Sequence, residues 1–254
     1  MPRAPEDLRA AARAYLDELA LTPELGGLAE PVRYAIGGKL IRPVLCLGTG
    51  DAIGVEVEAL LPAAAAVELV HSFSLVHDDL PALDDDRERR GRPSVWAEHG
   101  EATAILAGDA LLSEAFRLAL SYPYPEVARE LVAATLAMIG GQYLDLAGGA
   151  DLEELHRLKT GALFSAAVMC ALWAAEVPID EHPPWRAFAG ELGLLFQAVD
   201  DVLDGDGYVH EVGMEGARRV ADEAAERAQA RLAEIDADTA VLAELVAGLA
   251  TRTS

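Results

Sequence analysis

The strongest constraint on the fold is an almost wholly apolar stretch, residues 63–76, that ends abruptly in carboxylates. Because nearly every side chain in it is apolar or small, we expect a helix that is buried on all sides. Asp78 and Asp79 then lie at the C-terminal end of this helix, where lost hydration and the negative end of the helix dipole both disfavour them. With Asp84 close behind, the sequence predicts that something positively charged binds here.

A second apolar stretch that ends in carboxylates lies far downstream, over residues 191–204. Asp200 and Asp204 are one helical turn apart and share a face, with Asp201 about 100° round from Asp200. Two buried acidic clusters would repel each other unless a cation lay between them. Mg²⁺ commonly shares its shell between protein carboxylates and substrate phosphates. The pattern therefore indicates two aspartate clusters that face each other across Mg²⁺ and a diphosphate.

The composition favours an all-α protein with one domain, residues 1–254. Aromatic residues make up only 6% of the chain, and β-branched runs bounded by hairpin turns are absent. The length is sufficient for one large core. After the second aspartate cluster we expect one or two amphipathic helices over residues 214–250, with their charges in solvent.

The charge and the cysteines limit the partners and the compartment. A formal net charge of −23 makes nucleic acid and anionic membrane surfaces poor partners. We see no signal peptide and no uninterrupted apolar run of membrane-spanning length, so we expect no stable membrane insertion. Cys46 and Cys170 stand in apolar surroundings far apart in the chain, which favours reduced core residues in a cytoplasmic protein.

The basic residues point to anion binding. Eighteen of the twenty are arginine, so Lys39 and Lys159 are exceptions, and a compact ammonium is favoured at both positions. Lys39 and Arg42 follow a glycine turn, Gly37-Gly38, that can bring cations and backbone N–H groups close to an anion. Arg89 and Arg90 follow the first aspartate cluster closely enough to bind outer phosphate oxygens.

Two histidines are also compatible with another class of site, a di-iron centre. His71 lies two turns before Asp78, on a similar face of the same helix. Glu68 with His71, and Glu153 with His156, form two of the Glu-x-x-His pairs that di-iron helical bundles use. That alternative leaves both aspartate clusters without a purpose.

Seven motifs, taken in order, resemble the trans-isoprenyl diphosphate synthase (polyprenyl synthetase) family over about residues 30–205. They are Gly38-Lys39 with Arg42-Pro43, Asp78-Asp79-x4-Asp84 followed by Arg89-Arg90-Gly91, Gly108-Asp109-Ala110, Gly141-Gln142, Lys159-Thr160-Gly161, Phe196-Gln197, and Asp200-Asp201-x2-Asp204. The resemblance implies an isoprenoid-synthase-type helical bundle around a deep central cavity, and a homodimer. It also implies head-to-tail condensation of isopentenyl diphosphate with an allylic diphosphate, dimethylallyl or geranyl.

The resemblance also assigns roles to single residues. Two Mg²⁺ ions would be held by Asp78, Asp79 and Asp84, and a third by Asp200, supported by Asp201 and Asp204. The residues expected around the allylic diphosphate and its reacting carbon are Arg89, Lys159 and Gln197, with Thr160 and Gln197 supplying dipoles that stabilise the carbocation. Isopentenyl diphosphate would be bound by Lys39, Arg42, His71 and Arg90.

Product length should depend on the helix before the first aspartate cluster. Phe73 would place a ring across the tunnel for the growing chain, and Ser74 leaves room beside it. An aromatic residue at this position resembles the pattern of the farnesyl synthases in this family. We therefore expect mainly a C15 product, with a C20 (geranylgeranyl) product as the alternative.

The chain departs from the family after the second aspartate cluster. The glycine- and lysine-containing loop expected there is shortened, and no lysine follows Lys159. One cationic contact is then missing unless Arg218 or Arg219 folds back. A catalytically weak subunit that binds prenyl diphosphates beside an active partner is therefore another possibility. A terpene cyclase would leave Lys39, Arg42 and His71 without a purpose.

Overall fold

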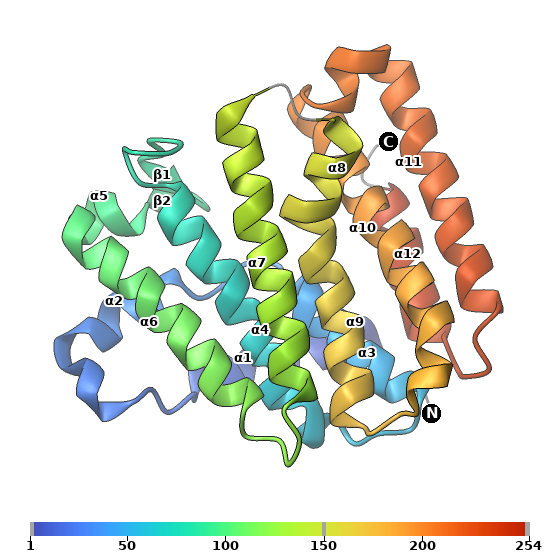
Figure 1. Cartoon of the computed structure of the whole chain (residues 1–254), viewed down its shortest axis with the longest axis horizontal. Helices are drawn as coiled ribbons and strands as arrows, with labels where there is room; N and C mark the ends of the chain where they lie inside the picture. The colour runs from blue at the N-terminus through green and yellow to red at the C-terminus, as the bar shows by residue number, and fades with distance from the viewer. Residues whose placement is uncertain (1–2, 149–150, 252–254) are drawn as a thin grey trace.

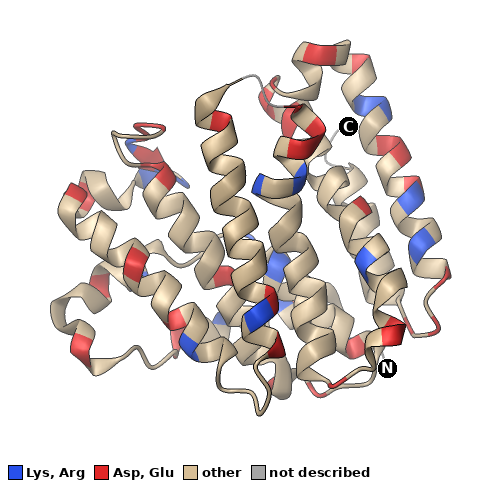
Figure 2. Ribbon diagram, viewed as in Figure 1, with Lys and Arg blue, Asp and Glu red and all other residues tan. Residues whose placement is uncertain are grey.

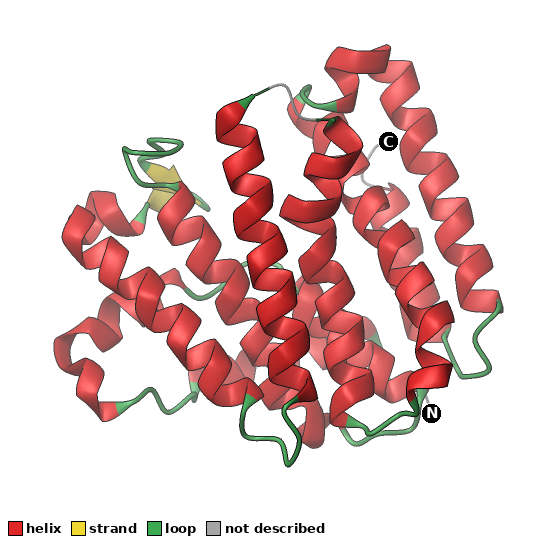
Figure 3. Ribbon diagram, in the orientation of Figure 1, coloured by secondary structure: helices red, strands yellow, loops and turns green. Residues whose placement is uncertain are grey.

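The computed structural model describes residues 3–148 and 151–251 and is built almost entirely from helices (Figures 1 and 3). The first half of the chain contains α1 (Pro5–Asp17), the 3₁₀ turn η1 (Pro23–Leu28), α2 (Ala29–Ala35), α3 (Ile41–Ala52), α4 (Val57–Asp78), α5 (Val95–His99) and α6 (Glu101–Ala119). The second half contains α7 (Glu126–Ala147), α8 (Leu152–His156), the π-helical turn η2 (Arg157–Gly161), α9 (Ala162–Ala174), the 3₁₀ turn η3 (Ile179–Glu181), α10 (His182–Asp204), α11 (Tyr208–Ala233) and α12 (Ala240–Ala250). The all-α prediction is confirmed.

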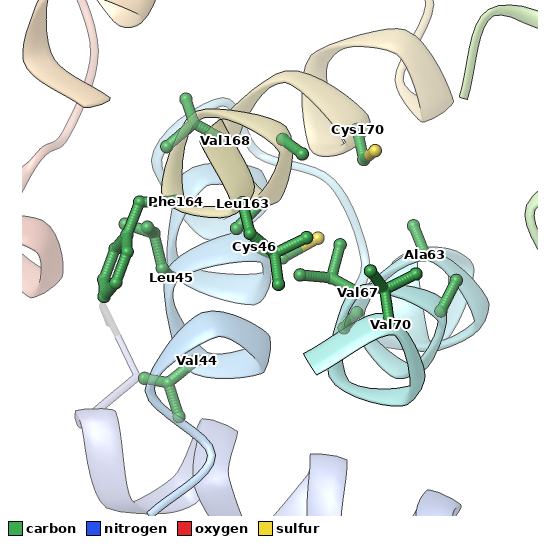
Figure 4. Close-up of a cluster of buried hydrophobic side chains, with 14 of the residues drawn as sticks. Val44, Leu45, Cys46, Ala63, Val67, Val70, Leu163, Phe164, Val168 and Cys170 are labelled. Carbon is green, nitrogen blue, oxygen red and sulfur yellow. The ribbon is translucent and has the colours of Figure 1, made fainter. Parts of the chain in front are cut away.

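Helix α4 is the centre of the core, as the apolar stretch at residues 63–76 predicts. It packs against α3, α6 and α9, and Figure 4 shows Val67 and Val70 of α4 close to Cys46 of α3 and Leu163 of α9. Although α4 is long and apolar enough to cross a membrane, 67% of its most apolar window is buried inside the bundle. Its composition is therefore that of a core helix.

A proline inside α4 is accommodated by a side chain from another part of the chain. Pro62 interrupts the hydrogen-bond ladder of the helix. The Tyr122 hydroxyl donates to the Ala59 carbonyl at 2.8 Å and accepts from the Ala63 N–H at 3.1 Å. Tyr122, in the break after α6, thus fixes the start of the apolar stretch.

One small element was not expected. Strands β1 (Glu88–Arg89) and β2 (Arg92–Pro93) form an antiparallel hairpin beyond α4. Its two central residues, Arg90 (φ 58°) and Gly91 (φ 74°), both have positive φ, as a type I′ turn requires. Two-residue strands are too short to give a periodic signal, so the sequence indicated only a polar loop.

The helices carry both aspartate clusters to the same end of the bundle. Figure 1 shows α4, α7 and α10 running in the same direction, with their C-terminal ends near the hairpin and α8. Acidic residues gather at this end, on the hairpin loop, α8 and the start of α11 (Figure 2). The C-terminal region forms two helices, as predicted: α11 begins at Tyr208 but is broken by the non-helical backbone of Gly213 (φ 73°), so its long continuous part follows Gly213.

Candidate active site

A cavity of about 370 Å³ lies between α4 and α7 and extends to η2 and α3. Most of its lining is apolar, and the predicted residues that line it are Arg42, His71, Phe73, Asp78, Lys159 and Thr160. Lys39, Arg89 and Arg90 do not line this cavity. A mostly apolar pocket that also contains charged groups is the arrangement expected for chemistry on an apolar chain with an ionic head.

The first aspartate cluster lies at the mouth of the cavity. Burial raises the pKa of Asp78 to about 6, against the opposing charge of Lys159, and the neighbouring carboxylates Asp84 and Asp79 raise it further. Asp79 is almost fully buried, and burial raises its pKa as well. Carboxylates held this close together favour a bound cation, because it removes their mutual repulsion.

Arg89 already has carboxylate partners in this structure. Its guanidinium donates to Asp79 from Nε at 2.9 Å and from Nη2, and Nη2 also donates to Asp86 at 2.8 Å. The arginine therefore holds the hairpin against the end of α4. A contact with the allylic diphosphate would use Nη1, which takes part in none of these bonds.

The three aspartates at the end of α10 have different surroundings. Asp200 is half-buried, and its charge partly opposes the lowering of the Arg42 pKa by burial; Arg42 lines the same cavity as Asp78. Asp204 is exposed. Asp201 is 5% exposed and accepts hydrogen bonds from Gln197 Nε2 at 2.7 Å and from the Tyr208 N–H at 2.8 Å.

Both carboxylate oxygens of Asp201 are thus engaged by protein donors. In addition, His156 Nε2 lies 3.8 Å from Asp201 Oδ2. This fits the supporting role expected for Asp201 better than direct metal ligation. It also explains Gly207, because a side chain there would collide with the Asp201 carboxylate.

Lys159 and Thr160 are presented by the π-helical turn η2. Lys159 Nζ pairs with Asp145 Oδ2 at 2.6 Å, and Thr160 Oγ1 donates to Gln197 Oε1 at 2.7 Å. A Cβ at Gly141 would lie 2.6 Å from the Lys159 nitrogen, so glycine is required for η2 to pass this close to α7. The wider turn aims both polar side chains into the cavity, as π-helical turns often do at functional sites.

A basic cluster lies beside the cavity. Arg42 is buried, with its guanidinium 4.6 Å from the centre of the Phe164 ring, and burial lowers its pKa to about 10. Burial also lowers the pKa of His71 well below its usual value, so His71 is neutral at pH 7. Buried Glu68 has a pKa raised to about 7 by burial, against the opposing charges of Arg42, Arg90 and Arg13.

Sequence reasoning missed one member of this cluster, Arg13. It lies on α1, and its Nη2 donates to the Gly38 carbonyl at 2.7 Å. No spacing in the sequence connects a residue of the first helix with the glycine turn. Only the packing of α1 against α3 and α4 brings them together.

The described residues form no complete set of protein ligands for a metal ion. Among residues 3–148 and 151–251, no three His, Cys, Asp or Glu side chains converge to hold a metal ion by themselves. The two Glu-x-x-His pairs therefore do not form a di-iron centre within that part of the chain. Carboxylate oxygens that need a substrate's oxygens to complete the shell are what Mg²⁺ accepts.

Comparison with known proteins identifies the family. A family model described as polyprenyl synthetase matches residues 26–217, well over half of the chain. The chain belongs to the polyprenyl synthetase family. A farnesyl diphosphate synthase from Haemophilus influenzae is 36% identical over 260 residues, which cover 86% of this chain and 88% of that protein.

Solved structures agree with this polyprenyl synthetase fold. A geranyltransferase from Legionella pneumophila has a TM-score of 0.84 and 32% identity, covering 98% of this chain and 96% of that one. An isoprenoid synthase family member from Thermotoga neapolitana has a TM-score of 0.87 and 29% identity, covering 96% and 99%. The isoprenoid-synthase-type bundle implied by the resemblance is confirmed.

Two facts limit what the relatives imply for this polyprenyl synthetase. With three further farnesyl and geranylgeranyl diphosphate synthases, the matched segment spans only 64 to 66% of the relative's length. A heterodimeric geranylgeranyl pyrophosphate synthase small subunit from Arabidopsis thaliana is also 34% identical, over 87% of this chain and 73% of that protein.

Proposed function

We propose that this polyprenyl synthetase is a short-chain trans-prenyltransferase that condenses isopentenyl diphosphate head-to-tail with dimethylallyl or geranyl diphosphate. The observation that carries the proposal is the cavity itself, which joins an apolar channel past Phe73 to Asp78 and Lys159 at its mouth. The allylic C–O bond breaks, and the bonding electrons leave with the diphosphate. The double bond of isopentenyl diphosphate then attacks the allylic carbocation, and a proton lost from the adduct passes to the released diphosphate.

The chain's own residues would stabilise the charges of this reaction. Lys159 faces the charge that develops on the leaving diphosphate, and the Thr160 and Gln197 dipoles face the carbocation without attacking it. The apolar lining excludes water that would quench the cation. Mg²⁺, which we expect at three ions per site, would be held by Asp78, Asp79, Asp84 and Asp200, with Asp201 and Asp204 in support, and would neutralise the leaving group.

We propose Lys39, Arg42, His71 and Arg90 as the site of the second substrate, isopentenyl diphosphate. Arg42 supports this most directly, because its buried Nε has no hydrogen-bond partner among the described residues. A buried cationic donor without a partner is costly, so a ligand that accepts from it binds favourably. We expect mainly a C15 product because the Phe73 ring stands in the cavity wall.

A homodimer is supported by an apolar surface on α7. Five of its large side chains are 40 to 70% exposed and recur every three to four residues along one face: Val132, Leu136, Ile139, Tyr143 and Leu146. Ile105 and Leu106 of α6 are also exposed. A row without charges is suited to packing against the same row of a second copy.

The shortened loop after the second aspartate cluster is the reason to consider a second function. Arg218 and Arg219 lie exposed on α11 and do not line the cavity, so neither supplies the missing lysine in this arrangement. A subunit that binds prenyl diphosphates but needs an active partner is therefore the alternative, and the match to a heterodimeric small subunit favours considering it.

One experiment separates the two candidates. Purified protein is incubated with Mg²⁺, labelled isopentenyl diphosphate and each of the C5, C10 and C15 allylic primers. We expect C15 product from the C5 and C10 primers without any second protein. Product formed only after an active synthase is added would favour the subunit function, and no product in either case would reject both. We expect the activity in the cytoplasm, since Cys46 and Cys170 are buried and unpaired.

A further inference from the structure

Among the carboxylates of residues 3–148 and 151–251, none forms an ion pair with four cations beside the glycine turn at residues 37–39. Within the described part of the chain, nine arginines form ion pairs within 4.0 Å of a carboxylate. Arg13, Lys39, Arg42 and Arg90 form none there, although the chain has a net charge of −23. Five other described arginines also form none, but these four cations lie together beside one turn, where an anionic ligand is expected.

The guanidinium groups of Arg13 and Arg90 both lie beside Gly37, although the two residues are far apart in the sequence. A Cβ built on Gly37 would lie 3.7 Å from Arg13 Nη1 and 3.6 Å from Arg90 Nη1. At Gly38 (φ 102°) a Cβ would lie 2.8 Å from Arg90 Cζ, so only glycine lets this guanidinium lie against the backbone. Two guanidinium groups beside one turn repel each other unless an anion lies between them.

Glu68, the acidic residue near these arginines, does not neutralise their charge. Arg13, Arg42 and Arg90 all act on buried Glu68, and none forms an ion pair with it. Because burial raises the pKa of Glu68 to about 7, its negative charge is incomplete at neutral pH. A single, partly protonated carboxyl group cannot balance three guanidinium groups.

We propose that Arg13 is a further substrate-binding residue, contributed by α1 to the same diphosphate pocket as Lys39, Arg42 and Arg90. Its Nη2 is used on the Gly38 carbonyl, which orients the planar group, and its other N–H groups are directed to the diphosphate of isopentenyl diphosphate. This inference rests on the proposed function, since it deepens the description of the same site.

The test uses isopentenyl diphosphate without an allylic primer, so that binding is measured in the absence of reaction. Titration calorimetry compares the full-length protein with Arg13→Gln and Arg13→Lys. We expect Arg13→Gln to raise Kd by about tenfold or more and Arg13→Lys to raise it less. In turnover assays we expect the KM for isopentenyl diphosphate to rise similarly, while kcat and the KM for geranyl diphosphate stay within about twofold.

The chain offers a matched control in Arg9. It lies one turn before Arg13 on α1, and its Nε donates to the Lys39 carbonyl at 3.0 Å, so it also tethers the turn, but it is paired with Glu6. If Arg13 served only as a tether, Arg9→Gln and Arg13→Gln would change Kd alike, and the proposal would be overturned. An unchanged Kd in Arg13→Gln would overturn it as well.

Two further outcomes are distinguishable. A wild-type protein that fails to bind isopentenyl diphosphate would reject the proposed function, whatever the variants do. If Arg13→Gln does not fold, Arg13→Lys decides, because it keeps the charge but loses the planar fork. A raised Kd in that variant with Arg9→Gln unchanged supports the proposal, and equal values for all three proteins refute it.

Discussion

Thr160 Oγ1 donates a hydrogen bond to Gln197 Oε1 at 2.7 Å and thereby joins the π-helical turn to α10. Gln197 Nε2 donates onward to Asp201 at 2.7 Å, and Asp201 accepts the first N–H of α11. One chain of hydrogen bonds therefore runs from the cavity to Asp201 of the second aspartate cluster and on to the start of α11. Its geometry fixes the orientation of the two dipoles that we place beside the carbocation.

The first prediction concerns the Thr160 hydroxyl. Thr160→Val keeps the shape of the side chain and removes the donor, so the Gln197 amide loses its orientation. We expect kcat/KM to fall by about tenfold to hundredfold, with little change in melting temperature. Thr160→Ser keeps the hydroxyl and should retain most of the activity; a valine variant as active as the serine variant would remove Thr160 from the mechanism.

The second prediction concerns product length. Phe73→Ala opens the cavity wall, and we expect the main product to lengthen from C15 to C20 or beyond when isopentenyl diphosphate is in excess, as read by chromatography of the dephosphorylated products. Phe188 is fully buried and does not line the cavity, so Phe188→Ala controls for general loosening of the core. An unchanged product in Phe73→Ala would show that another residue forms the floor.

The third prediction tests the first aspartate cluster. Asp78→Asn removes one of the carboxylates at the mouth, and we expect activity at saturating Mg²⁺ to fall by at least about a hundredfold. Asp85→Asn is the control, because Asp85 (φ 53°) has a left-handed conformation that asparagine also tolerates. Equal losses in the two variants would mean that the effect is one of net charge and not of metal binding.

The fourth prediction follows from Glu68. Burial raises its pKa from near 4.5 to about 7, so the folded state holds the proton more tightly than the unfolded chain. The stability from this group is complete below about pH 4.5 and is lost as the pH rises to 7. Across this window the free energy of unfolding should decline by up to about 3 kcal/mol more in wild type than in Glu68→Gln.

Urea denaturation between pH 5 and 8 without substrates measures this difference. Other groups titrate in both proteins, so their contributions cancel when the two profiles are subtracted. Two profiles of the same slope would show that Glu68 is already ionised in the folded protein.

The fifth prediction concerns the apolar row on α7. Leu136 lies within this row and is 64% exposed. Leu136→Glu should convert a dimer into a monomer, as measured by light scattering. Leu120 is similarly exposed, at 62%, but lies outside the row, so Leu120→Glu should leave the dimer intact. A monomeric wild-type protein would instead leave the row available to a different partner.

Much of the fold followed from local patterns. The apolar run at residues 63–76 indicated a core helix with aspartates at its end, and α4 is that helix. The site was harder, because its members come from α1, α3, α4, α7, η2 and α10. The motif Lys159-Thr160-Gly161 and the motif Phe196-Gln197 could both be found in the sequence, but nothing in their spacing indicated that Gln197 would contact Thr160.

The sequence by itself determined which helices are buried and where they end in charge, because the period of apolar residues and the abrupt change to aspartate are local properties of the chain. Only the tertiary structure decided how each charge is used. Asp201 turns inward to Gln197 and Tyr208, Arg89 binds Asp79, and Arg13 joins the glycine turn. The physical reason is that the free energy of a buried charge depends on the partner that packing brings to it, and that partner comes from elsewhere in the chain.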